Sequence, residues 1–166
     1  MKLLEPWKKV DTVVSIDLRS LRQAGADTLL LDMDNTVVPW HTFDIDERIY
    51  EWIVEAKQIG FKICIISNNQ RWRIEKLSGM LGVHGIWNAC KPLLGGYIKA
   101  LSKLESEKHT SVFVGDQLFT DILGANILGL KTILVNPISK REYRWTKFMR
   151  KMESLLARRD FEDKVG

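Results

Sequence analysis

Four short groups of polar residues along this chain have side chains that could hold a divalent metal ion beside a phosphoryl group. Carboxylates offer hard oxygen ligands to a cation, while a hydroxyl and an amine can donate hydrogen bonds to a phosphoryl oxygen. In chain order the groups are Asp32-Met33-Asp34-Asn35-Thr36, Ser67-Asn68, Lys91-Pro92, and Gly115-Asp116 with Asp121. Each group alone is common turn chemistry, so its meaning depends on whether the fold brings the four together.

The two aspartates of the first group could divide the work of one reaction. Asp32 directly follows the apolar run Leu29–Leu31, and a carboxylate held there could attack phosphorus to form an aspartyl-phosphate. Asp34 lies two residues later, on the same side of an extended segment. It could give a proton to the leaving oxygen and later take one from the attacking water. We therefore expect Asp32 and Asp34 to be catalytic, together with Lys91.

A cation is needed because two carboxylates would repel a negatively charged phosphate. Mg²⁺ suits this position, since it prefers oxygen ligands and can screen the nucleophile and polarise the phosphoryl group. We expect it to be held by Asp32, by Asp116 and by Asp34 through a nearby backbone carbonyl. Asp121 is expected to complete this metal site, either from behind these ligands or through a water molecule.

The phosphoryl group of a phosphorylated substrate needs donors of its own. We expect Ser67 to donate a hydroxyl hydrogen bond, with help from neighbouring backbone N–H groups, and Asn68 and Thr36 to contribute further contacts. Lys91 supplies the remaining positive charge, which matters most when charge spreads over the equatorial oxygens of the transferred group.

The elements that must position these groups alternate between strands and helices. Apolar runs predict strands at Thr28–Leu31, Phe61–Ile66, Gly85–Ala89, Val112–Val114 and Thr132–Val135. Apolar residues at helical spacing predict helices at Leu18–Ala24, Asp46–Ile59, Trp72–Leu81, Pro92–Leu104 and Phe119–Leu128. This alternation predicts an α/β fold with a mainly parallel sheet, in which ligands bind at the carboxyl ends of the strands.

Length and composition place limits on the whole chain. The 166 residues suffice for one domain with a full core, and we expect a single domain over residues 1–166. No apolar run approaches the length that spans a bilayer, and we expect no signal peptide from the first residues. The two cysteines are too few for a disulfide framework. We therefore expect a cytoplasmic protein.

In this order and after apolar strands, the four groups resemble the four motifs of the haloacid dehalogenase (HAD) superfamily of phosphohydrolases. The run from Asp32 to Thr36 is similar to its first motif in the form of subclass IIIA. Ser67 resembles the second motif, Lys91 the third, and Asp116 with Asp121 the fourth. A narrower resemblance to the YqeG family rests on Ser15-Ile16-Asp17-Leu18, Asp34-Asn35-Thr36-Val37-Val38-Pro39-Trp40, Ala89-Cys90-Lys91-Pro92 and the segment Gly115–Asn126.

The resemblance covers about residues 10–140 and implies a HAD-like, Rossmann-like fold with three α/β/α layers. It also implies Mg²⁺ dependence and hydrolysis of a phosphomonoester through an aspartyl-phosphate. Related members act on phosphatidylglycerophosphate, which makes that lipid one candidate substrate. The alternatives are a soluble phosphatase for a nucleotide, sugar phosphate or nucleic-acid end, and a binding module that keeps the fold without turnover.

Two further features bear on the substrate. The intervals from Thr36 to Ser67 and from Ser67 to Lys91 are filled by predicted helices and strands, so we expect no cap domain and an open site. Residues 140–160 predict a basic amphipathic helix, with six Lys and Arg against Glu142 alone between Lys140 and Lys151. Such a helix could lie on the anionic inner face of the membrane or pack on the core. We therefore expect the membrane surface as one partner, contacted peripherally, and favour nucleic acid less.

Overall fold

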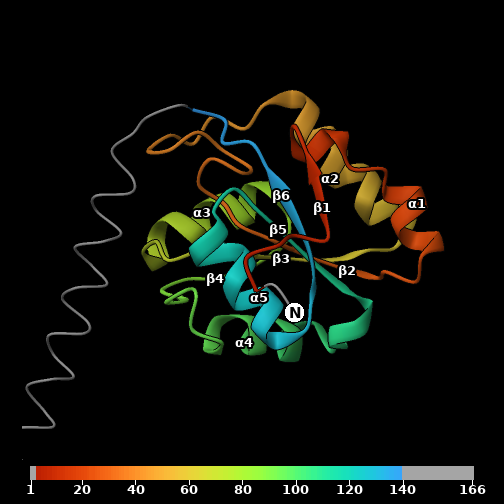
Figure 1. The fold of residues 1–166 in the computed structure, drawn as a ribbon. Helices are drawn as coiled ribbons and strands as arrows, with labels where there is room; N and C mark the ends of the chain where they lie inside the picture. The colour runs from red at the N-terminus through yellow and green to blue at the C-terminus, as the bar shows by residue number, and fades with distance from the viewer. Residues whose placement is uncertain (1–2, 140–166) are drawn as a thin grey trace, which may run out of the picture.

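A six-stranded, all-parallel sheet forms the centre of the molecule (Figure 1). The computed structural model describes residues 3–139. The strand order is β1-β6-β5-β2-β3-β4. The strands are β1 (Lys8–Val10), β2 (Thr28–Leu31), β3 (Lys62–Ile66), β4 (His84–Ile86), β5 (Ser111–Gly115) and β6 (Lys131–Val135).

Helices cover both faces of this sheet, which confirms the predicted three-layer α/β/α architecture (Figure 1). The α-helices are α1 (Leu18–Gln23), α2 (Glu47–Ile59), α3 (Arg71–Leu81), α4 (Gly95–Leu104) and α5 (Leu123–Leu128). Shorter turns are η1 (Val13–Ser15), η2 (Lys108–Thr110) and the π-helical η3 (Leu118–Ile122). One apolar cluster joins the sheet to α1, α2 and α3, and a second joins it to α4 and α5.

Strand β2 shows why the central strands are continuously apolar in sequence. Leu29 and Leu31 belong to the cluster under α1–α3, whereas Leu30 belongs to the cluster under α4 and α5. Alternate side chains of a strand point to opposite faces, so a strand with helices on both sides must be apolar at every position. All four residues of β2 are buried.

Polar side chains and glycines mark the ends of several helices. The Asp17 side chain accepts a hydrogen bond from Ser20 N at 3.0 Å, and the Asp46 side chain accepts one from Arg48 N at 2.9 Å. These are the amino-terminal caps of α1 and α2. Gly60 and Gly129 end α2 and α5 with φ of 97° and 86°, a left-handed conformation that glycine adopts without steric cost.

The predicted start of α4 at Pro92 is wrong, because the helix begins at Gly95. Both backbone groups of Lys91 are bound by the side-chain amide of Asn68. Lys91 N donates to Asn68 Oδ1 at 2.6 Å, and Asn68 Nδ2 donates to Lys91 O at 3.0 Å. This pairing across 23 residues holds the chain around Lys91 in a turn, so that α4 begins only at Gly95.

One strand was not predicted, and the clearest other shifts are in β4 and at the start of the helix before α5. The edge strand β1 was not expected, since Lys8 and Lys9 are exposed and give it no apolar signature. The short strand predicted at Gly85–Ala89 lies at His84–Ile86. The helix predicted from Phe119 begins as the π-helical turn η3 at Leu118.

No cap domain is inserted among residues 3–139, as expected. The chain from Thr36 to Ser67 contains a loop, α2 and β3, and the chain from Ser67 to Lys91 contains α3 and β4. No helix in this described part is both long and apolar enough to cross a membrane. The amphipathic helix predicted at 140–160 lies outside the described residues, so it and the single domain over 1–166 stay predictions.

Candidate active site

Three neighbouring strands deliver the polar groups to one edge of the sheet. Strand β2 lies between β3 and β5, with Leu31 in register with both Ile65 and Val114. Asp32, Ser67 and Asp116 follow the carboxyl ends of β2, β3 and β5 in turn. Asp32 N also donates to Val114 O at 2.8 Å, which fixes the start of the first motif on β5. Ligands of parallel α/β sheets bind at such a point, where the chain leaves β2 towards β3 and leaves the neighbouring β5 towards β6, in the opposite direction.

Lys91 lies at the centre of the buried charges at this edge. Its Nζ donates to Asp32 Oδ1 at 2.6 Å and to Asp121 Oδ1 at 2.7 Å. All three side chains are almost completely buried. The fold therefore gathers the first, third and fourth motifs around one ammonium group.

Opposite charges in this cluster stabilise each other, whereas the two carboxylates repel. Burial alone would lower the pKa of Lys91, but the neighbouring carboxylates of Asp121 and Asp32 outweigh this effect, so its pKa is raised. Burial raises the pKa of Asp121 to about 6, with Lys91 opposing the rise and Asp32 adding to it. The ammonium group is thus firmly protonated and offsets the two carboxylates it contacts.

Asp32, Asp116 and Asp121 form an acidic cluster in which one carboxylate oxygen of each residue lies within 4.8 Å of the other two. Gln117 N donates to Asp121 Oδ2 at 3.0 Å. A Cβ on Gly115 would stand 2.5 Å from the same oxygen, so only glycine leaves room for Asp121 there. Three carboxylates at one point form the oxygen-rich donor set that a hard cation such as Mg²⁺ requires. This arrangement fits a divalent metal site.

The Asp34 carboxylate is not part of that acidic cluster. Its Oδ1 accepts from Arg73 Nη2 at 2.8 Å, and its Oδ2 accepts from Asn69 Nδ2 at 3.2 Å. The Asp34 carboxylate is therefore bound by Arg73 and Asn69, and the expected metal ligand from Asp34 is its backbone carbonyl oxygen.

Sequence reasoning missed Arg73, although a signal was present. Arg73 falls on the same helical stripe as Leu77 and Leu81, where an apolar residue would be expected. All three are buried in α3. A charged residue on a core stripe needs a buried partner, and here the partner is Asp34.

The predicted phosphate contacts have different surroundings. Ser67 Oγ accepts from Asn69 N at 3.1 Å, so the hydroxyl hydrogen remains to be donated to another group. Thr36 Oγ1 donates to Asp32 Oδ2 at 3.1 Å. The Asn68 side chain is used on the backbone of Lys91. Thr36 therefore positions the Asp32 carboxylate, and Asn68 positions the backbone of Lys91.

Tyr97 binds the backbone of the fourth motif through its hydroxyl group, and sequence reasoning also missed it. Its hydroxyl donates to Thr120 O at 2.7 Å, next to Asp121. A Cβ on Gly124 would lie 2.8 Å from this hydroxyl and 2.6 Å from Pro92 O. Close packing at Gly124 therefore sets the third and fourth motifs directly against each other. In sequence, Tyr97 has no signal beyond a core position of α4.

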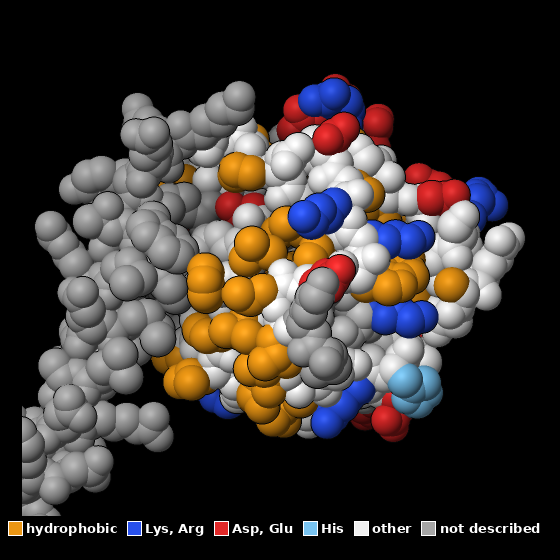
Figure 2. Space-filling view, in the orientation of Figure 1, with side chains coloured by type: hydrophobic (Ala, Val, Ile, Leu, Met, Phe, Trp, Pro, Cys, Tyr) orange, Lys and Arg blue, Asp and Glu red, His pale blue; other side chains and the backbone are white. Residues whose placement is uncertain are grey.

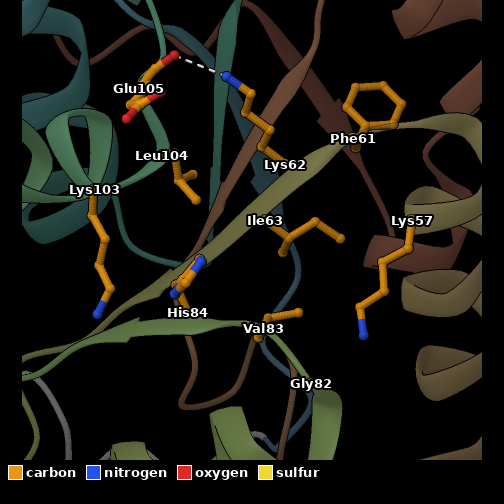
Figure 3. A pocket seen from close by; sticks show the side chains of 10 residues that line it. All are labelled: Lys57, Phe61, Lys62, Ile63, Gly82, Val83, His84, Lys103, Leu104 and Glu105. Carbon is orange, nitrogen blue, oxygen red and sulfur yellow. Dashed lines mark hydrogen bonds between the residues drawn. The ribbon is translucent and has the colours of Figure 1, made fainter.

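A cavity of about 620 Å³ lies at the opposite edge of the sheet and contains none of the predicted catalytic residues (Figure 3). Lys57, Lys62 and Lys103 line it, together with the first residues of β3 and β4. Lys57 Nζ donates to Leu81 O at the end of α3, and Lys62 Nζ donates to Glu105 O at the end of α4 at 2.8 Å. Both lysines satisfy helix carbonyls, so their charges have a structural explanation.

Comparisons with known proteins agree with this geometry. A family model described as HAD-hydrolase-like matches residues 89–141. Over 152 residues the chain is 35% identical to "Probable phosphatase YqeG" of Bacillus subtilis, covering 92% of this chain and 88% of that protein. The chain belongs to the YqeG family of HAD-superfamily phosphatases. The resemblance found in the sequence motifs is thereby confirmed.

Two more distant similarities place this YqeG-family chain in context. It is 26% identical over 170 residues to "Phosphatidylglycerophosphate phosphatase 1, chloroplastic/mitochondrial" of Arabidopsis thaliana, with 93% of this chain but only 47% of that protein covered. The crystal structure of a HAD phosphatase from Thermococcus onnurineus superimposes with a TM-score of 0.51 and 17% identity, covering 71% of this chain and 90% of that one. The second similarity shows the HAD-like fold.

Proposed function

We propose that this chain is a Mg²⁺-dependent phosphatase that hydrolyses a phosphomonoester through an aspartyl-phosphate on Asp32. The observation that carries the proposal is the buried contact of Lys91 with Asp32 and Asp121 at the carboxyl edge of the sheet. Asp116 joins the two aspartates in one acidic cluster there. Membership of a phosphatase family supports the same reaction.

In the first half of the proposed reaction the Asp32 carboxylate attacks phosphorus. A bond forms between a carboxylate oxygen and phosphorus while the bond from phosphorus to the leaving oxygen breaks. Asp34 gives a proton to that leaving oxygen, so the product departs as a neutral alcohol. In the second half, Asp34 takes a proton from the water that attacks the aspartyl-phosphate. This step releases inorganic phosphate and restores the Asp32 carboxylate.

The other residues offset charge and hold geometry. Lys91 keeps a positive charge against Asp32 as the negative phosphoryl group arrives, and Ser67 donates its hydroxyl hydrogen to a phosphoryl oxygen. Thr36 fixes the Asp32 carboxylate through its hydrogen bond. When bound at Asp32, Asp116 and Asp121, with the backbone carbonyl of Asp34, Mg²⁺ would screen these carboxylates and polarise the phosphoryl group.

We further propose a lipid phosphate as substrate, with phosphatidylglycerophosphate at the inner membrane face as the candidate. Leu93 is 61% exposed in the turn that follows Lys91, and Leu118 and Phe119 are 37% and 40% exposed in η3, which also carries Asp121. Figure 2 shows hydrophobic side chains gathered on the face formed by α4 and α5. Large exposed apolar patches are typical of protein or membrane contacts. The distant similarity to the Arabidopsis enzyme points to the same lipid.

Phosphate release measured with and without Mg²⁺ tests both parts of the proposal. Wild-type protein should release phosphate from phosphatidylglycerophosphate in vesicles, and Asp32→Asn should abolish this activity. A parallel set of soluble nucleotide and sugar phosphates separates the lipid from the soluble substrates. Activity that survives in Asp32→Asn would contradict the mechanism. Faster hydrolysis of a soluble phosphate than of the lipid would contradict the substrate but leave the mechanism standing.

A further inference from the structure

Arg73 is a buried cation that joins two parts of the chain at the site. Its side chain is 5% exposed, and its Nη2 donates to Asp34 Oδ1 at 2.8 Å. Its Nη1 donates to Thr42 O at 2.7 Å, in the loop that follows the first motif. The guanidinium also lies over the Phe43 ring, 5.1 Å from its centroid. One side chain of α3 therefore holds both the proposed acid and the loop beyond it.

An apolar side chain would satisfy the core at this position at lower cost. Taking a charge out of water is expensive, and a buried ion pair often stabilises a fold no better than well-packed hydrophobic residues. The neighbouring stripe positions Leu77 and Leu81 show that apolar residues serve the rest of α3. The presence of Arg73 is therefore better explained by what it does to Asp34 than by stability.

The geometry of arginine suits the task of aiming a carboxyl group. Its planar guanidinium donates along fixed directions, whereas lysine presents a single flexible ammonium. Here two nitrogens bind Asp34 and the Thr42 carbonyl at the same time. Asn69 Nδ2 contacts the other Asp34 oxygen at 3.2 Å. With a donor on each oxygen, the Asp34 carboxyl group cannot rotate freely.

We propose that Arg73 is a positioning residue for Asp34, aiming its carboxyl group at the leaving oxygen and coupling that aim to the loop at Thr42 and Phe43. This inference rests on the proposed function, in which Asp34 protonates the leaving group. Proton transfer requires the donor to lie within hydrogen-bond reach of the oxygen. Displacement of Asp34 should therefore lower the hydrolysis rate most for substrates whose leaving oxygen most needs a proton.

Leaving groups of different basicity test this prediction. 4-Nitrophenolate leaves readily as an anion, whereas unsubstituted phenolate is more basic and gains more from protonation. We expect Arg73→Lys and Arg73→Met to lower kcat/KM for phenyl phosphate at least about tenfold more than for 4-nitrophenyl phosphate, within the range of about 10²–10⁴ that acid–base catalysis contributes. A purely structural role would lower both rates by the same factor.

Arg71 provides a matched control on the same helix. Its side chain is 67% exposed, and its Nε pairs with Glu75 Oε1 at 2.7 Å. Arg71→Gln should leave the ratio of the two rates at the wild-type value. Arg73→Lys keeps the charge and guards against the outcome that Arg73→Met fails to fold.

A double variant tests whether Arg73 acts through Asp34. In an Asp34→Asn background, adding Arg73→Lys should change the phenyl phosphate rate by less than about threefold, because residues that act as one unit are not additive. Equal losses with both substrates, or a full additional loss in the double variant, would overturn the inference. If wild-type protein hydrolysed no phosphomonoester at all, the proposed function would fall, and this inference with it.

Discussion

The substitution Gly115→Ala tests the acidic cluster with a single methyl group. A Cβ at this position would stand 2.5 Å from Asp121 Oδ2 and 2.6 Å from Asp121 Cβ. Ordinary contacts begin at 3.4 Å, so Asp121 would have to move by 3.4 − 2.5 = 0.9 Å. Asp121 cannot move without disturbing Lys91, to which it is bound at 2.7 Å. One added methyl group should therefore displace both a proposed metal ligand and the central cation.

The expected effect is large for such a small change. A misplacement of about 1 Å can cost about 100-fold in rate, and overpacking a filled core costs about 1–3 kcal/mol. We expect kcat/KM to fall about 100-fold and the Mg²⁺ concentration for half-maximal activity to rise. Thermal unfolding with and without Mg²⁺ gives a second reading, because a ligand that binds only the folded state raises the melting temperature. That rise should shrink in Gly115→Ala.

Gly95→Ala is the matched control for this experiment. A Cβ on Gly95 would meet nothing within 4 Å, and Gly95 begins α4. Replacing a helical glycine by alanine stabilises a helix by about 0.5–1 kcal/mol, so this variant should melt slightly later and keep its activity. Wild-type rate and Mg²⁺ dependence in Gly115→Ala would refute the reasoning, since they would show that Asp121 need not stay where the structure places it.

Three other predictions concern the buried side chains of Lys91 and Cys64 and the exposed side chain of Leu93. Lys91→Met should abolish phosphate release and lower the free energy of unfolding by about 3–5 kcal/mol in urea titration, because it leaves buried carboxylates without their cation. A loss of activity with unchanged stability would contradict the buried pairing. Burial raises the pKa of the Cys64 thiol to about 12, so the unfolded chain loses this proton at lower pH than the folded one and stability should fall as pH rises above about 9. Cys64→Val should show a smaller fall than wild type in the same pH series, and an identical fall would count against the shift. Leu93→Ser should reduce phosphate release from lipid presented in vesicles while leaving the hydrolysis of 4-nitrophenyl phosphate unchanged. Equal effects on both substrates would argue against contact of Leu93 with the membrane.

The sequence was sufficient for five of the six strands, β2 to β6, and for the gathering of the motifs, because both depend on local, periodic signals. Strand β2 was predicted with its observed bounds, since helices on both faces force an unbroken apolar run. Asp32, Ser67 and Asp116 follow strands that lie side by side, so their place at one edge follows from topology alone.

The errors arose where contacts distant in sequence decide the local structure. Pro92 is a good first residue for a helix, but the side chain of Asn68 holds Lys91 in a turn and delays α4 to Gly95. The edge strand β1 is defined by its pairing with β6 and has little apolar pattern of its own. Arg73 interrupts the apolar stripe of a predicted helix, but its partner Asp34 lies 39 residues away, so the sequence did not show what a charge at this position would contact.

The all-parallel sheet aligns the dipoles of the helices that connect its strands. Every strand points the same way, and the helices that return the chain must run in the opposite direction, so the carboxyl ends of α3 and α4 meet the lysines at the far edge. Their amino ends, which carry partial positive charge, open toward the aspartates. These partial charges would offset part of the repulsion between the aspartates and an approaching dianion, so the fold itself adds to the charge compensation that a bound cation would give at this edge.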